Sequence, residues 1–185
     1  KYMKRYTDGK FKHAGVMLDG QIIEHDVQVN RNYNPDKGVK PFLGQILQPL
    51  KDVDKDFIIS DLSKINQWER QKIGHEQDRT AKDGTKYTWK VGTMEFPDNL
   101  NKPSRTILTS EGTRSASRTS HIIYQQETFR RLTPIELERL NMFPDDFTNI
   151  KNIPITKRGF IMGNALVIGV VEKIGFQLSS IIDSN

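Results

Sequence analysis

Residues 130–147 read RRLTPIELERLNMFPDDF, and they carry the most complete helix-start signal in the chain. Thr133 is placed to cap the helix, Pro134 occupies the first helical position, and Glu136 follows three residues after the cap. A Thr and a Glu at this spacing form a capping box, and proline fits the first turn because its missing N–H is not needed there. The stretch predicts a helix that begins at Pro134 and ends before the second proline, Pro144.

A second helix is expected to begin near Asn164, which can cap it. Apolar residues recur on one face of this helix at spacings of three and four: Val167, Val170, Val171, Ile174, Leu178 and Ile181. Further apolar residues lie on its other sides: Leu166, Ile168 and Phe176. A helix of this kind has to be covered on more than one flank, and no other segment of the chain supplies an obvious second layer for it.

The first two thirds of the chain are expected to form short strands joined by turns. The strongest signal is a hairpin around Asp19 and Gly20, because this pair accepts the positive φ angles of a type I′ turn. Other expected elements are strands at residues 87–91, 106–109 and 121–124, a turn at 81–84, a surface helix over 61–77, a loop over 30–40 and a short helix or strand over 42–50. The expected fold class is α+β, with a mixed, short-stranded, β-rich domain over residues 1–128 and a helical segment over 129–185.

The composition excludes several kinds of site. The chain of 185 residues contains no cysteine, which excludes disulfides, cysteine-ligated zinc, iron–sulfur clusters and a cysteine nucleophile within it. It shows no signal peptide and no uncharged apolar run of about 18 residues, so a cytoplasmic protein with no membrane span is expected. The four histidines stand apart and no phosphate-binding glycine loop occurs, so neither a metal site nor a catalytic constellation is predicted.

Positive charge gathers in one window, residues 102–131. The whole chain has a formal net charge of +5, and this window alone holds six Lys or Arg residues against two Glu. Serine and threonine are frequent in it, and Gly112 would allow close backbone approach. Arginine and small hydroxyl groups are side chains that bind phosphates and base edges, so the window is a candidate DNA-binding surface. On composition alone, a solvated polar loop is the alternative interpretation.

The stretch at residues 130–147 also resembles a known motif. It is similar to the ninth conserved motif of the DNA (cytosine-5) methyltransferases, R-x-L-T-P-x-E-x-x-R-L-x-G-F-P-D, with Met142 in place of the usual glycine. Residues 158–167, RGFIMGNALV, resemble the tenth motif of the family with its G-N-A/S-V core. Residues 103–107, PSRTI, resemble the R-T-I segment of the target-recognition region. The three elements occur in the order and spacing of the family.

The resemblance implies that the chain is the C-terminal part of such an enzyme. The family binds S-adenosylmethionine mainly on an N-terminal F-x-G-x-G loop and attacks cytosine with the cysteine of a P-C motif, helped by the glutamate of an E-N-V motif. None of these motifs occurs here. The resemblance implies that an N-terminal catalytic region of the same protein, or a separate catalytic subunit, supplies them. The final helix would pack on that α/β catalytic domain, and this chain alone is expected to be inactive.

The resemblance also suggests roles for residues of this chain. It implies that Gly163, Asn164 and Ala165 border the S-adenosylmethionine pocket, and the first turn of a helix suits the carboxylate of that cofactor. Contacts to double-stranded DNA are expected from residues of the basic window: Arg105, Thr106, Thr109, Ser110, Arg114, Ser117, Arg118 and Thr119. Among these, Thr106 would contact the phosphate near the target cytosine, which the family flips out of the duplex.

Three hypotheses on function follow. The first is the DNA-recognition and C-terminal portion of a DNA (cytosine-5) methyltransferase, which transfers a methyl group from S-adenosylmethionine to cytosine in a specific duplex site, as in restriction–modification systems. The second is a stand-alone sequence-specific DNA-binding module without enzymatic activity. The third is a restriction nuclease or a structural interaction domain. Asp83 and Lys86 are a loose signal for a nuclease, and a charged turn explains them at least as well.

Overall fold

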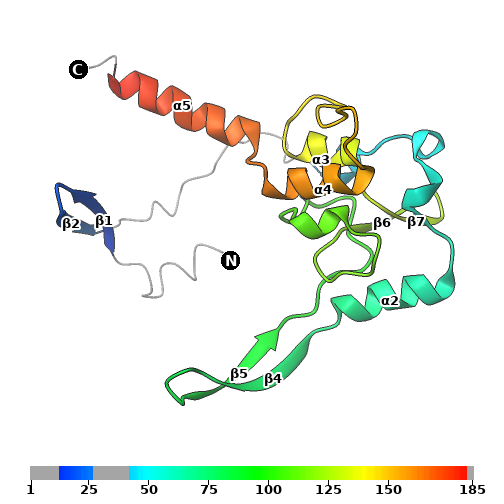
Figure 1. The fold of residues 1–185 in the computed structure, drawn as a ribbon, viewed down its shortest axis with the longest axis horizontal. Helices are drawn as coiled ribbons and strands as arrows, with labels where there is room; N and C mark the ends of the chain where they lie inside the picture. Colours follow the sequence, from blue (N-terminus) through cyan, green and yellow to red (C-terminus); the bar gives the residue numbers. More distant parts are fainter. Residues whose placement is uncertain (1–12, 27–41, 183–185) are drawn as a thin grey trace. The chain divides into compact units, whose positions relative to one another are not determined.

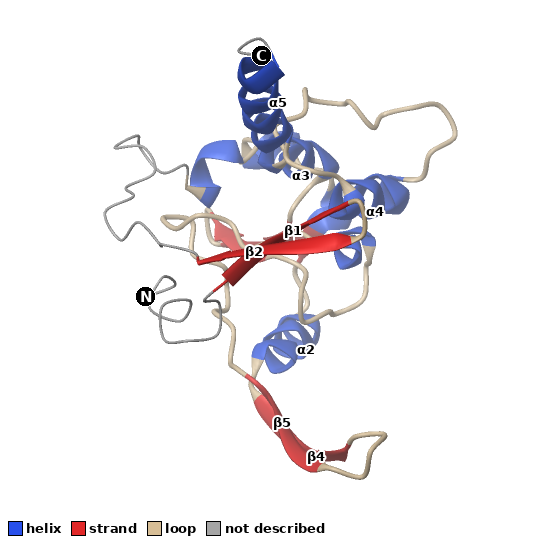
Figure 2. Ribbon diagram, turned by 90° about the vertical axis from the view of Figure 1, so that its left-hand side faces the viewer, coloured by secondary structure: helices blue, strands red, loops and turns tan. Residues whose placement is uncertain are grey.

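The computed structural model describes residues 13–26 and 42–182 of the chain. These residues fall into two units, 1–39 and 40–185, and each unit is described by itself. The described strands are short, and helices predominate toward the C-terminus (Figures 1 and 2). The mixture of helices with short strands in small sheets confirms the predicted α+β class.

The described residues of the first unit form an antiparallel hairpin, made of β1 (His13–Leu18) and β2 (Gln21–Asp26). Asp19 and Gly20 join the strands with φ angles of 50° and 77°. Two successive positive φ angles are what a type I′ turn requires. The predicted hairpin is confirmed, and the loop predicted over residues 30–40 lies outside the described residues.

The second unit combines a small sheet with helices and a separate hairpin. Its elements are η1 (Leu43–Ile46), η2 (Leu50–Asp52), η3 (Lys55–Phe57), β3 (Ile58–Ile59), α2 (Leu62–Lys72), β4 (His75–Thr80), β5 (Lys86–Val91), η4 (Thr109–Gly112), β6 (Ile122–Gln125), β7 (Thr128–Arg131), α3 (Pro134–Leu140), α4 (Ile155–Asn164) and α5 (Ile168–Ile182), where η marks a 3-10 helix. β3, β7 and β6 pair antiparallel in that order, and β4 pairs only with β5 among the described strands.

The three-stranded sheet is covered on both faces. Ile122 and Ile123 follow one another on β6 and are both fully buried, and successive side chains of a strand point to opposite faces. Ile123 belongs to a cluster with Leu43 of η1, Leu137 of α3, Met162 of α4, and Leu132, which precedes α3. Ile122 belongs to a second cluster with residues of β3 and α2: Ile59 and Trp68. The sheet thus joins segments from the whole length of the unit.

The predicted capping box is present at the start of α3. The Thr133 hydroxyl accepts a hydrogen bond from the Glu136 backbone N–H at 3.3 Å, and the Glu136 carboxylate accepts one from the Thr133 backbone N–H at 2.8 Å. The helix ends at Leu140, and Met142 follows with a positive φ of 62°. Glycine adopts this conformation at no steric cost, which gives a physical reason for glycine at this position of the motif.

A fully buried ion pair joins β7 to α3. Arg130 and Glu136 are both 0% exposed, and the guanidinium donates two hydrogen bonds to the carboxylate, at 2.6 and 2.8 Å. The backbone N–H of Gln48 donates a further bond to Glu136 at 2.8 Å, and Arg130 Nε donates to the Gln125 side chain at 2.7 Å. This pair therefore connects the segment after η1, the sheet and α3 at one point.

A second buried ion pair joins α3 to α4. Arg158 of α4 donates to the Glu138 carboxylate at 2.8 Å, and the same oxygen accepts bonds from Thr148. Burial alone would raise the pKa of Glu138, but the hydrogen bonds from Thr148 and Arg158 outweigh it and hold the pKa below its ordinary value. Glu138 therefore stays ionised and fixes α4 against α3.

Two elements in the middle of the chain differ from the predictions. The helix predicted over residues 61–77 ends at Lys72, because residues 75–80 pair with β5 as strand β4. The strand predicted over residues 106–109 is wrong, since Thr109 begins η4 and Leu108 lies against α4. In both places, contacts with a distant part of the chain outweigh the local pattern.

The C-terminal region contains two helices where one was expected. Asn164 is the last residue of α4, and α5 begins at Ile168, so the predicted helix start at Asn164 is wrong. α4 contains Gly159 and Gly163, and glycine lowers helix propensity, which is why the local pattern gave no helix there. The apolar residues predicted for the last helix lie largely on α5.

The domain boundary at residue 128 stays a prediction. In the structure, β6 and β7 form one hairpin across this position, with Gln125 opposite Thr128. The central cluster likewise draws Leu43 from one side of the boundary and Met162 from the other. Residues 42–182 therefore share a core on both sides of the predicted boundary.

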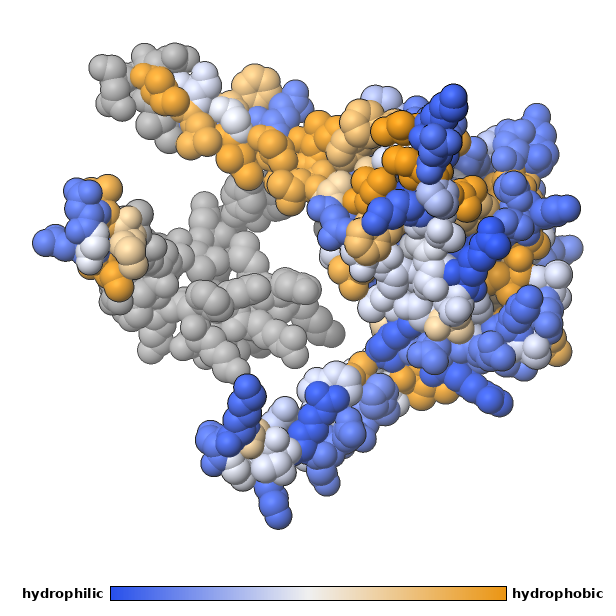
Figure 3. Space-filling model, in the orientation of Figure 1, coloured by the Kyte–Doolittle hydropathy of each residue, from blue (hydrophilic) through white to orange (hydrophobic). Residues whose placement is uncertain are grey.

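Helix α5 exposes apolar side chains along its length (Figure 3), with Ile174 56% and Ile182 73% exposed. Among the described residues, the segment Ile155–Ser180 has the length and hydropathy of a membrane-spanning helix. Helical geometry is interrupted at residues 165–167, however, so the segment consists of two helices of 10 and 15 residues. Each of these described helices is shorter than the about 20 residues that cross a bilayer.

Replacing Arg130 with Met should destabilise the protein by about 3–5 kcal/mol, because it leaves the buried Glu136 carboxylate without its partner. The matched control is Lys90→Met, which breaks an exposed pair with Glu76 and should cost less than about 1 kcal/mol. Urea unfolding followed by circular dichroism measures both free energies of unfolding. Similar losses in the two variants would contradict the importance that we give to the buried pair.

Candidate functional site

Helix α4 and the loop around η4 approach one another closely, and glycines make this possible. A Cβ on Gly112 would overlap the Thr156 carbonyl, and a Cβ on Gly163 would overlap the backbone of Leu108 and Thr109. The loop belongs to the window predicted to bind DNA, and the end of α4 is the segment predicted to border a cofactor. The structure therefore places the two predicted sites side by side, with Gly163 against Thr109.

The three residues predicted to border the cofactor pocket lie at the end of α4. Asn164 is exposed and its side-chain amide donates to the Phe160 carbonyl at 3.1 Å, while Gly163 and Ala165 are half-buried. The C-terminal end of a helix presents carbonyl oxygens and a negative potential. The expected helix start at Asn164 is therefore wrong, and the role of these three residues at the S-adenosylmethionine pocket stays a prediction.

The residues predicted to bind DNA differ in exposure. Three of them are exposed to solvent: Thr106, Thr109 and Arg114. Three others join their hydroxyl groups within the loop, where Thr119 lies 2.6 Å from the Ser110 hydroxyl and 3.4 Å from the Ser117 hydroxyl. The exposed group is free to meet a ligand, and the bonded group holds the loop in shape.

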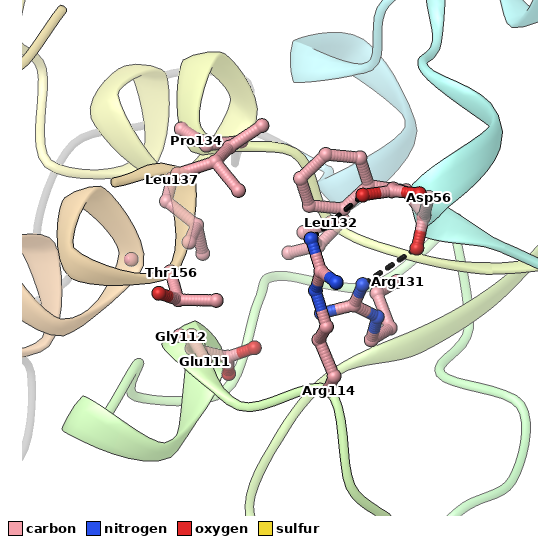
Figure 4. Close-up of a pocket in the computed structure, with 12 residues that line it drawn as sticks. Asp56, Glu111, Gly112, Arg114, Arg131, Leu132, Pro134, Leu137 and Thr156 are labelled. Carbon is pink, nitrogen blue, oxygen red and sulfur yellow. Dashed lines mark hydrogen bonds and ion pairs between the residues drawn. The ribbon is translucent and has the colours of Figure 1, made fainter. Parts of the chain in front are cut away.

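Arg114 and Arg131 converge on Asp56 (Figure 4). Arg114 donates to the Asp56 carboxylate at 2.7 Å, and Arg131 donates to the Asp56 backbone carbonyl at 2.7 Å. The cavity drawn there has a volume of about 10 Å³, which is room for one water molecule. The same three residues also line a second, open hollow of about 190 Å³ together with Lys64 and Trp68. The Arg114–Asp56 pair is exposed, and exposed pairs are weak, so the Arg114 guanidinium is available to a phosphate group.

Two of the predicted DNA-binding arginines are engaged within the chain. Arg105 donates to the Asp98 carboxylate at 2.7 and 3.1 Å and to the Thr119 carbonyl at 3.1 Å. Arg118 donates to three backbone carbonyls, those of Gln71, Ile73 and Gly92. These bonds position loops, and direct contact of Arg105 or Arg118 with DNA stays a prediction.

Lys72 is a buried charge that the sequence does not indicate. Its side chain is 1% exposed, and its ammonium donates to the carbonyls of Arg118 at 2.7 Å and of Ser120. Burial lowers the pKa of Lys72 to about 8, and the nearby charge of Arg105 acts in the same direction. No local signal marks this residue, because its partners lie 46 and 48 positions later in the chain.

The half-buried Ser104 and the buried His121 and Glu111 form a hydrogen-bonded group that the sequence does not indicate. The Ser104 hydroxyl lies 3.1 Å from His121 Nε2, and His121 Nδ1 lies 2.6 Å from the Glu111 carboxylate, which is the atom order of a catalytic triad. The Ser104 hydroxyl, however, donates to the Arg105 carbonyl at 2.8 Å, and Glu111 also accepts the backbone N–H of His121. His121 is fully buried, so this group closes the loop and has a structural role.

Comparison with known proteins yields one family and one relative. Residues 8–180 match the model of the C-5 cytosine-specific DNA methylases. The chain is 36% identical over 172 residues to the Type II methyltransferase M.Sau3AI of Staphylococcus aureus, which covers 93% of this chain and 39% of that protein. The chain thus spans about two fifths of the length of this relative. No solved structure gives a significant match.

Replacing Gly163 with Ala should destabilise the protein by about 1–3 kcal/mol, since the added methyl group overlaps the backbone of the η4 loop. Gly175→Ala on α5 is the matched control: a Cβ there meets nothing within 4 Å, and alanine favours a helix by up to about 1 kcal/mol. Chemical denaturation of both variants gives the two values. If Gly163→Ala were as stable as Gly175→Ala, the close packing of α4 on the loop would be wrong.

The stability contributed by Lys72 should rise with pH between about 8 and 10. The pKa of Lys72 is about 8 in the folded protein and near 10.4 in an unfolded chain, so the unfolded state binds more protons over this range. The free energy of unfolding of the wild type should therefore increase relative to that of Lys72→Met, by on the order of 2 kcal/mol. Unfolding curves of the two proteins at several pH values measure this difference, and parallel pH profiles would contradict it.

Proposed function

The chain belongs to the C-5 cytosine-specific DNA methylase family, and from this membership we propose that it is the DNA-recognition and C-terminal portion of a DNA (cytosine-5) methyltransferase. The observation that carries the proposal is the family match over residues 8–180 of a sequence that contains no cysteine. The nucleophile of the reaction is a cysteine, so in this proposal it lies outside these 185 residues. The reaction transfers a methyl group from S-adenosylmethionine to cytosine in duplex DNA in the cytoplasm.

The loop that carries the basic window is the proposed DNA contact. Its exposed members Thr106, Thr109 and Arg114 offer two hydroxyl groups and a guanidinium whose present partner, Asp56, holds it only through an exposed pair. Phosphate contacts of this kind fix the register of a protein on a duplex. In this proposal, the remaining predicted residues of the window, Ser110, Ser117, Thr119, Arg105 and Arg118, act mainly by holding the loop.

Gly163, Asn164 and Ala165 are proposed to form an edge of the methyl-donor site that is completed by the rest of the enzyme. S-adenosylmethionine would supply the methyl group, and the carboxylate of this cofactor would be bound outside the chain, because the end of α4 has the wrong polarity for an anion. Close packing of Gly163 on Leu108 would hold this edge next to the DNA-contacting loop.

Helix α5 is proposed to dock on the part of the enzyme that carries the cysteine. Its exposed apolar residues, among them Val171, Ile174 and Leu178, would otherwise remain in water. A contiguous exposed apolar surface of this kind marks a protein interface. The alternative function, a stand-alone DNA-binding module, leaves this helix face without a role and is the weaker proposal.

The test is methyl transfer from labelled S-adenosylmethionine to duplex DNA. We expect no incorporation with the 185-residue chain alone, and incorporation when the cysteine-bearing part of the enzyme, identified by sequencing the flanking gene, is added. Ile174→Asp should lower this reconstituted activity at least about tenfold, because it buries a charge in the interface. Ser179→Asp places the same charge about 140° around α5 from Ile174, away from that apolar face, and should have little effect.

Two results would count against the proposal. Incorporation by the chain alone would show that the chain does not need an external cysteine. A complete lack of incorporation by the combined parts, with both folded and DNA present, would show that the chain is not a portion of such a methyltransferase.

A further inference from the structure

The hairpin of β4 and β5 is exposed along nearly its whole length. It extends away from the helices that surround the three-stranded sheet (Figures 1 and 2), and all six residues of β4 are exposed. Its strands pair only with each other, from His75 opposite Val91 to Thr80 opposite Lys86. A hairpin that packs on no core is marginal in water by itself, so its length and composition call for an explanation beyond folding.

One face of this hairpin, which we call the Arg79 face, carries aromatic and hydrogen-bonding side chains. The register places six residues on it: His75, Gln77, Arg79, Tyr87, Trp89 and Val91. The Arg79 guanidinium lies 4.1 Å from the centre of the Trp89 ring and donates to the Gln77 side chain at 3.1 and 3.2 Å. The His75 ring meets the Trp89 ring edge-on at 5.4 Å. These contacts orient an exposed arginine and glutamine before any ligand binds.

The opposite face has a different character. Both acidic residues of the paired strands lie there, and each has a cross-strand partner: Glu76 accepts from Lys90 at 2.8 Å, and Asp78 accepts from Thr88 at 2.8 Å. The Arg79 face contains no acidic residue. The opposite face also carries Lys86 and Lys90, so its formal charge is zero, whereas Arg79 gives the Arg79 face a formal charge of +1. A polyanion would therefore meet net attraction on the Arg79 face and two carboxylates among the charges of the other.

The base of the hairpin is held firmly to the rest of the unit. Arg118 ties its two ends together by donating to the Ile73 carbonyl on one side and the Gly92 carbonyl on the other. The Gly74 backbone N–H donates to the Thr93 hydroxyl at 3.1 Å, and the Met94 N–H donates to the carbonyl of the buried Lys72 at 2.8 Å. The direction in which the hairpin leaves the unit is thus set by a network of hydrogen bonds.

We propose that the Arg79 face of the β4–β5 hairpin enters the major groove of the duplex and reads bases there. The major groove is wide enough for a two-stranded ribbon, and six residues per strand give the hairpin a reach of about 20 Å. Arginine pairs with guanine and glutamine with adenine through two hydrogen bonds each, and Arg79 and Gln77 are presented together. This inference rests on the proposed function, since it names the part of the chain that selects the DNA sequence.

The test compares three variants of the 185-residue chain in binding to a library of short random duplexes. Arg79→Ala removes the guanidinium, Arg79→Lys keeps the charge and loses the planar fork, and Lys90→Ala removes one positive charge from the opposite face. Arg79→Ala should lower the affinity for the selected duplexes about tenfold or more, and Lys90→Ala less than about twofold. Arg79→Lys should retain binding to random duplexes and select a broader set of sequences.

Trp89 provides a second readout that needs no substitution. The chain has two tryptophans, and Trp68 is 3% exposed whereas Trp89 is 36% exposed. Adding duplex to the unaltered chain should protect the exposed tryptophan emission from quenching by iodide. Circular dichroism of each variant checks that the rest of the unit is folded, and the core clusters lie outside the hairpin.

The outcomes separate this inference from the proposed function. Equal effects of Arg79→Ala and Lys90→Ala, unchanged iodide quenching on binding, or tighter binding to single strands than to duplex would each overturn the role of the Arg79 face. Each of these leaves the methyltransferase assignment standing if the reconstituted enzyme transfers methyl groups. If the unaltered chain binds no duplex even with the rest of the enzyme present, both proposals fail.

Discussion

The buried pair of Arg130 and Glu136 is the interaction on which the fold of residues 40–185 depends. An ionised group in the interior is tolerated only with a partner, so each of these side chains requires the other. The Glu136 carboxylate also closes the capping box with Thr133 and accepts a bond from Gln48. One side chain thereby sets the end of β7, the start of α3 and the path of the segment after η1. Apolar side chains in place of the Arg130–Glu136 pair could stabilise the fold equally, but they would not fix the directions of β7, α3 and the segment after η1.

A few specific contacts fix the candidate site relative to α3. Glu138 holds Arg158 on α4, and α4 in turn fixes the η4 loop because Gly112 and Gly163 allow backbone to meet backbone. Only nine hydrophobic residues of the described chain are buried, which is few for a unit of this length. Hydrogen bonds and ion pairs therefore fix much of the relative placement of helices and loops, because these bonds require particular distances and angles. Arg118 therefore has a structural role, since it donates to backbone carbonyls, although it lies in a basic loop.

The sequence predicts features that depend on contacts between neighbouring residues, and it does not predict features that depend on contacts between residues far apart in the chain. The capping box at Thr133 and the turn at Asp19 were predicted because their partners lie within three residues. Strand β4 and helix α4 were missed, since one is defined by pairing with β5 and the other carries two glycines that only the contact with the η4 loop explains. The hydrogen bonds of the Lys72 ammonium could not be predicted either, because its partners, the carbonyls of Arg118 and Ser120, are more than forty positions away. Residue types in the basic window indicated DNA, but not which arginines remain exposed.

The two exposed elements of the unit differ in chemistry in a way that indicates two different partners. The apolar residues of α5 gain free energy by leaving water, so they favour a protein surface that covers them permanently. The Arg79 face presents polar groups that already bond with one another, and such groups are exchanged for those of a hydrated ligand at little cost. The proposed permanent protein contact through α5 and the proposed reversible DNA contact through the hairpin and the loop would together give the division expected of the part of an enzyme that selects a site for chemistry performed by another part.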